Sequence, residues 1–222
     1  MATMITEARS SEMHESICNR HQRLCQRTKG AEVLVQKIAP CIVNLSNKRI
    51  ETQRCKQNKE EMNDGVILAN SEMDDEVRTL HEKCKQYDRE HPGSQLVKRI
   101  FPGGKIGTIT RASLKSQSTE MGQLVVRLNS LEEEHPLRSA IAPMQESMTK
   151  EQEAQRLYRE AFSQWKAAIA EENIAKAELR QQYEHNYLDA VKLFGKRFAQ
   201  RLFPKLTKSK PAVDEQTTPE NN

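Results

Sequence analysis

The stretch ICNRHQRLCQRTKGAEVLVQKIAPCIVNL, from Ile17 to Leu45, decides the fold class because an apolar or small side chain recurs in it at every seventh residue. The same step continues beyond Leu45 as far as Tyr87, and only Thr52 and Lys59 break it. The complete ladder is Ile17, Leu24, Ala31, Ile38, Leu45, Thr52, Lys59, Val66, Met73, Leu80 and Tyr87. With a second apolar position three or four residues away, this is the repeat of helices that pack along a narrow seam. We therefore predict long helices of coiled-coil type.

Residues 1–90 are predicted to form an N-terminal helical arm. Pro40 lacks an amide hydrogen and kinks a helix, but the apolar spacing continues across it. Residues 46–65 are mostly polar and end in Asn-Asp-Gly, which is typical of turns, so a break in this stretch is the alternative. We favour one continuous helix, because the ladder resumes at Val66 in its original phase.

Residues 112–204 are predicted to form a second helical arm of similar length. Leu114, Met121 and Leu128 step by seven, and the apolar phase slips by one residue after Pro136, which predicts a kink over residues 136–143. The tail 205–222 has no apolar period and is expected to be disordered.

A segment rich in glycine and proline, residues 91–111, separates the two arms. LVKRIF (96–101) and KIGTIT (105–110) flank Pro-Gly-Gly, which predicts a small β-hairpin. The predicted fold is therefore all-α: a long antiparallel coiled-coil-like helical hairpin, or an elongated helix bundle, with a β-hairpin or loop at its tip.

The charge pattern favours a hairpin in which the second helical arm folds back on the first. From Ser16 to Lys59 there are ten basic residues against Glu32 and Glu51, whereas Glu151 to Asp189 is rich in acidic residues. Opposite flanking charges select partner and orientation in paired helices. Pairing between two molecules would satisfy the pattern equally well.

Composition excludes several protein classes. Hydrophobic residues make up 36% of the 222 residues and charged residues 30%, with a net charge of +4, so the chain is neither an ordinary thick-core domain nor a typical disordered one. The N-terminal sequence lacks a basic flank before an apolar run, and no stretch is apolar enough to span a bilayer. The five cysteines contain no CxxC pair. A cytoplasmic location is therefore expected.

Two basic segments are candidate binding sites. The tip carries Lys98, Arg99, Phe101, Lys105 and Arg111 without a nearby acid, and the C-terminal helix carries Lys192, Lys196, Arg197 and Arg201 among aromatic residues. Such segments bind acidic proteins, nucleic acid or anionic membranes. Alternatively, the tip is a solvated connector, and the aromatic rings of the C-terminal helix pack in the seam while its cations face solvent.

The nearest approach to a metal site is a set of four residues on one helical face. These are His14, Cys18, His21 and Cys25. One helix cannot wrap them around a single ion, so a neighbouring helix, through His185, would have to complete the site. We regard them mainly as tolerant residues at the edge of the seam.

No phosphate-binding loop, nucleophile elbow or paired CxxC motif occurs in the sequence. The sequence therefore favours a non-enzymatic structural or adaptor protein that acts by coiled-coil self-association or partner binding, without cofactor or small-molecule substrate. A peripheral binding module for anionic membrane or nucleic acid is the first alternative, and a helix-bundle metalloprotein the second.

Overall fold

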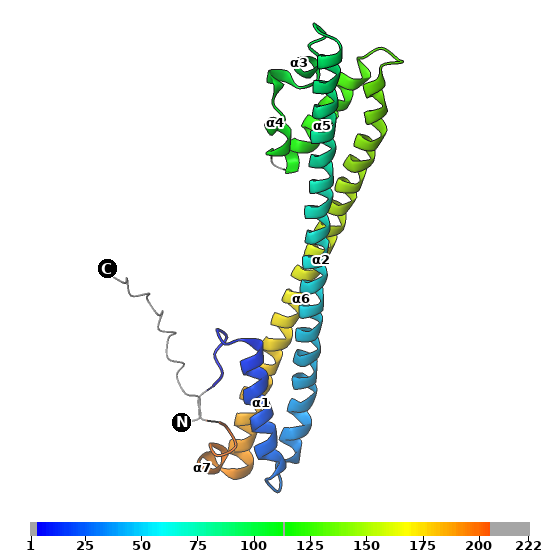
Figure 1. Cartoon of the computed structure of the whole chain (residues 1–222). Coiled ribbons are helices and arrows are strands. Elements are labelled where there is room, and N and C mark those ends of the chain that lie inside the picture. The colour runs from blue at the N-terminus through cyan, green and yellow to red at the C-terminus, as the bar shows by residue number, and fades with distance from the viewer. Residues whose placement is uncertain (1–3, 113, 205–222) are drawn as a thin grey trace, which may run out of the picture. The chain divides into compact units, whose positions relative to one another are not determined.

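The computed structural model describes residues 4–112 and 114–204, and every regular element in those ranges is helical (Figure 1). The two long helices are α2 (Glu32–Glu90) and α6 (Ile141–Phe194). The shorter α-helices are α1 (Ser11–Gln26), α3 (Leu96–Ile100), α4 (Gly107–Thr110), α5 (Leu114–Asn129) and α7 (Lys196–Ala199). Two 3₁₀ turns, η1 (Pro102–Gly104) and η2 (Pro136–Ala140), complete the described elements. The all-α prediction is confirmed for these residues.

The chain divides into two compact units. Unit 1 contains the described residues of 1–52 and 168–222, and unit 2 contains those of 53–167. Each unit has its own cluster of buried apolar side chains. The long helices α2 and α6 contribute to both units.

The predicted N-terminal arm is divided into two helices, α1 and α2, by a turn at residues 27–31. Ser10 caps α1 by accepting a hydrogen bond from the amide of Met13, at 3.2 Å, and α1 ends at Gln26. Gly30 adopts a φ of +87°, and the Phe194 ring lies 3.6 Å from the place of its missing Cβ. This turn needs glycine, because other residues are strained at that φ. The chain therefore leaves the helix at residues 27–31, whereas α2 continues through Pro40 and residues 46–65.

In unit 1, several polar contacts join α2 and α6 along their length. Lys37 pairs with Asp189 at 2.8 Å and Asn44 donates to Glu178 at 3.3 Å. Further along α2, Lys48 pairs with Glu171, and Thr52 donates to the Ala168 carbonyl at 3.2 Å. In this series of contacts, residue numbers rise along α2 as they fall along α6.

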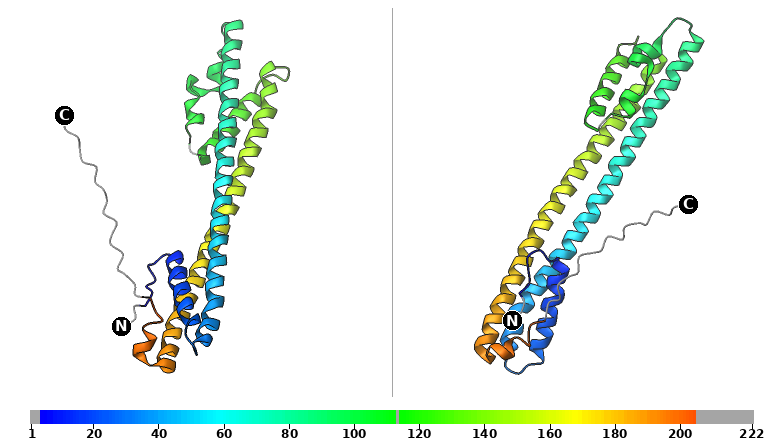
Figure 2. Two further views of the ribbon diagram at one scale, coloured as in Figure 1. Left: turned by 60° about the horizontal axis from the view of Figure 1, so that its bottom comes forward. Right: turned by 90° about the vertical axis from the view of Figure 1, so that its left-hand side faces the viewer.

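Helix α1 lies against the same segments of α2 and α6, as two directions of view show (Figures 1 and 2). The apolar core of unit 1 includes Ile17 of α1, Leu34 and Leu45 of α2, and Leu179 and Tyr183 of α6. Seam residues from three helices thus bury one another, since a helix pair alone covers only a narrow stripe.

In unit 2, α5 supplies the third side of the core. Met73 and Leu80 of α2, Leu124 and Leu128 of α5, and Met144 of α6 are all at most 1% exposed. The slip of the apolar phase predicted at Pro136 coincides with the 3₁₀ turn η2, after which α6 begins at Ile141.

The predicted β-hairpin of residues 96–110 is wrong. LVKRIF contains α3 and KIGTIT contains α4, with η1 between them, and the described residues form no strand. Burial explains the difference. Leu96 and Ile100 are four residues apart, share one helical face and are buried in the core of unit 2.

Asp88 fixes the start of α3. Its carboxylate accepts hydrogen bonds from the amides of Leu96, at 2.7 Å, and Val97, at 3.0 Å, and from the hydroxyl of Ser94. Desolvation opposes ionisation, but these hydrogen bonds outweigh it and lower the pKa of Asp88. The first amides of α3 are thereby satisfied from α2, as N-terminal helix groups require.

Within the part of the chain that the structure describes, no helix is both long and apolar enough to cross a membrane. The predicted disorder of residues 205–222 lies outside the described residues.

Candidate functional site

The tip residues are only partly available for binding. Phe101 is 1% exposed and packs against His81, with ring centroids 5.1 Å apart. Arg99 donates to the Ser130 carbonyl at 3.0 Å. Lys98, Lys105 and Arg111 are exposed. The tip therefore has an exposed basic surface, but its one aromatic side chain, Phe101, is buried and not available to a partner.

The C-terminal basic segment, residues 192–201, combines cations with exposed apolar groups. Lys192, Lys196, Arg197 and Arg201 are exposed, and Leu193 and Phe198 are 54% and 37% exposed. Arg201 lies 5.9 Å from the Phe198 ring centroid. Phe194 is half-buried against the core of unit 1. Phe194 thus packs at the seam, whereas Phe198 is partly exposed beside it, with ring centroids 5.3 Å apart.

The four candidate metal ligands are buried, but they do not converge on one point. Cys18 and Cys25 line the core of unit 1. Burial raises the pKa of the Cys18 thiol, and that of Cys25 to about 12, so neither is a thiolate at neutral pH. His185 is exposed and Asn186 is buried in its place. Among residues 4–112 and 114–204, no three His, Cys, Asp or Glu side chains are grouped to hold a metal ion.

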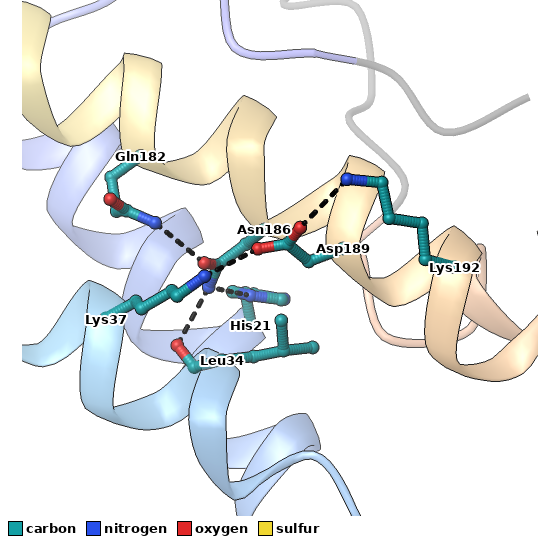
Figure 3. Close-up of polar contacts among 7 residues, drawn as sticks. All are labelled: His21, Leu34, Lys37, Gln182, Asn186, Asp189 and Lys192. Atoms are coloured by element: carbon teal, nitrogen blue, oxygen red, sulfur yellow. Dashed lines mark hydrogen bonds and ion pairs between the residues drawn. The ribbon is translucent and has the colours of Figure 1, made fainter.

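His21 instead belongs to a buried polar network (Figure 3). Its Nδ1 lies 2.8 Å from the Leu202 carbonyl oxygen, which can only accept, so Nδ1 carries the proton. Its Nε2 then accepts from the side-chain amide of Asn186, at 3.1 Å. Both ring nitrogens are therefore occupied. Burial lowers the pKa of His21, against the Leu202 hydrogen bond, and this favours the neutral ring.

Asn186 is the centre of this network. Its amide also donates to the Leu34 carbonyl at 2.9 Å, and its oxygen accepts from Gln182 at 2.9 Å. Asn186 thus links α1, α2 and α6 while all of its polar atoms are satisfied. Phe203 covers His21, with ring centroids 4.2 Å apart. The network is structural, because His21 and Asn186 are fully buried and only Gln182 is half-buried.

A partly exposed group of aromatic side chains on α6 was not predicted as a site. Tyr158, Phe162 and Trp165, in unit 2, form successive ring contacts at 6.2 and 5.9 Å, and we call them the aromatic face of α6. Phe162 and the neighbouring Leu157 are 39% and 37% exposed. Lys59 lies 4.9 Å from the Trp165 ring centroid. The sequence pattern assigned these rings to the seam, and periodicity alone does not reveal which seam residues lack cover.

Comparison with protein-family models, with curated proteins and with solved structures finds no match to this chain. Function must therefore be argued from the residues themselves.

Asn186→Ala tests the buried network. The substitution leaves His21 Nε2 without its donor, which costs about 1–3 kcal/mol, and removes one of the hydrogen bonds to the Leu34 carbonyl, which costs about 0.5–1.5 kcal/mol. The free energy of unfolding should therefore fall by about 1.5–4.5 kcal/mol. Urea denaturation followed by circular dichroism measures this loss.

Tyr183→Phe is the matched control, because the buried Tyr183 hydroxyl has no hydrogen-bond partner among the described residues. Its removal should leave stability unchanged or slightly raised. Equal losses in the two variants would contradict a special role of the Asn186 network.

Proposed function

We propose that the protein is a non-enzymatic structural or adaptor protein whose long helices pair as an antiparallel coiled-coil hairpin and bind a second copy, or another protein, through the aromatic face of α6. The observation that carries this proposal is the exposure of Phe162, whose ring contacts Tyr158 and Trp165, in a chain with only 5% aromatic residues. Exposed apolar patches mark interaction sites in proteins.

Contacts within unit 2 support the antiparallel pairing. Lys59 of α2 lies over Trp165, and Tyr87 at the other end of α2 lies 4.7 Å from His135, just before α6. Residue numbers again rise on one side as they fall on the other. The order matches that found separately in unit 1.

The core of unit 2 is thin beside the aromatic face. Over residues 53–72 of α2 only Val66 and Ala69 are buried apolar residues, and over residues 152–167 of α6 only Ala161 is. Ile67 and Leu68 are each 62% exposed on α2. Fully burying a large apolar side chain contributes about 1.5–3 kcal/mol. A partner helix that packed on this part of unit 2 would therefore bury apolar side chains that α2 and α6 leave exposed, and this burial would stabilise the complex.

Phe162→Ser combined with Leu157→Ser tests the contact. Both side chains are exposed, so the fold should persist while apolar area is lost from the interface. We expect the dissociation constant of self-association, measured by analytical ultracentrifugation, to rise at least tenfold. Cross-linking in cells should yield a heterologous partner at this face if the protein does not self-associate.

Val126→Ser is the matched control, because Val126 on α5 is 68% exposed and lies outside the aromatic face. It should leave association unchanged. A wild-type protein that stays monomeric at high concentration and forms no cross-link at the aromatic face would refute the proposal.

A second candidate function is binding to anionic membranes through the C-terminal basic segment. Here Leu193 and Phe198 are exposed among four cations, whereas the tip buries Phe101. Interfacial segments bind by combining apolar insertion with attraction to anionic lipids. This combination favours the C-terminal segment over the tip.

Vesicle sedimentation tests the membrane candidate. Wild-type protein should bind phosphatidylserine vesicles at low salt and release them at high salt. Lys196→Gln with Arg197→Gln should weaken binding at least tenfold, since each basic residue near the surface contributes about 1 kcal/mol. Lys98→Gln with Lys105→Gln, an equal change of charge at the tip, should weaken it less. Equal effects, or preferential binding to oligonucleotides, would reject this candidate.

A further inference from the structure

Unit 1 contains a cavity of about 290 Å³ whose walls come from α6, α1 and the segment before α1. Asn173, Lys176, Ala177 and Arg180 share one face of α6, because they follow one another at helical spacing. His14 of α1 and Glu7 complete the lining. The volume is near the lower end of ligand pockets, which range over roughly 300–1,000 Å³.

The cavity has more positive than negative charge. Lys176 and Arg180 form no ion pair within the described residues, and Glu7 is the single acid in the lining. Lys176 is half-buried at the cavity.

The buried side chain of His14 lies at this cavity and is affected by its positive charges. The ring is fully buried, its Nδ1 lies 2.9 Å from the Ser10 carbonyl, and its Nε2 has no partner among the described residues. Burial lowers the pKa of His14, the Ser10 hydrogen bond opposes this, and the charges of Lys176, Arg180 and Arg9 lower it further. Three cations therefore act on one buried ring and lower its pKa.

We propose that this cavity binds a small anionic molecule, a carboxylate or a phosphate ester, between Lys176 and Arg180. Arg180 supplies the planar donor pair that carboxylates and phosphates accept, and Lys176 supplies a point charge one helical turn away. Asn173 offers a neutral amide for orientation. The site lies outside the aromatic face and the C-terminal basic segment, so it stands or falls independently of both proposed functions.

Binding of inorganic phosphate and of succinate, measured by calorimetry at constant ionic strength, tests the site and separates the two ligand chemistries. Wild-type protein should bind at least one of them saturably with 1:1 stoichiometry. Arg180→Gln and Lys176→Gln should each weaken binding at least tenfold. Ala177→Leu narrows the cavity without a change of charge and should also weaken binding.

Lys150→Gln is the control, because it removes the same charge from α6 in unit 2, where Lys150 pairs with Glu146. It should bind as the wild type does. NMR titration of the His14 ring gives a second readout, since a bound anion offsets the neighbouring cations and should raise the pKa of His14.

Three results would overturn the proposal. These are no saturable binding of either anion, a loss in Lys150→Gln equal to that in Arg180→Gln, and an unchanged His14 titration at saturating ligand.

Discussion

The structure depends on the narrowness of its apolar seam. Two α-helices that meet along a seam bury only a stripe of each surface, and their free energy of association is correspondingly small. Each unit adds a third helix: α1 packs on Leu34 and Tyr183 in unit 1, and α5 places Leu124 beside Met73 in unit 2. Within the described part of unit 2, residues 53–72 and 152–167 bury only Val66, Ala69 and Ala161, and this stretch carries the aromatic face of α6.

Apolar packing alone does not fix the register of two long helices, because a slip by a heptad re-forms a similar seam. In unit 1 the polar network around Asn186 removes this ambiguity. A slip would leave the buried Asn186 amide and His21 Nε2 unpaired, which is costly in an apolar interior. The ion pairs of Lys37 with Asp189 and Lys48 with Glu171 are more exposed and contribute less.

The heptad ladder predicted the seam well, since Ile38, Leu45 and Met73 are fully buried where the period places them. It did not predict the turn at residues 27–31, because the turn preserves the apolar phase. The β-hairpin prediction was wrong because it used only the local turn sequence. It took no account of the hydrogen bonds that the first amides of α3 donate to Asp88, or of the apolar core that buries α3. The cavity at Lys176 and the buried Asn186 depend on which helix faces are covered, and one sequence does not contain that information. The basic residues of both segments are exposed, and the burial of Phe101 is what distinguishes the tip from the C-terminal segment.

Cross-linking by carbodiimide in a mixture of ¹⁴N- and ¹⁵N-labelled protein tests the central claim, the antiparallel pairing of α2 with α6 in one register and within one chain. The reagent joins lysine to carboxylate without a spacer, so it reports native ion pairs directly. The account predicts Lys37–Asp189 and Lys48–Glu171 links between peptides of the same isotope. Links displaced along α6, or the same links in mixed-isotope pairs, would contradict it.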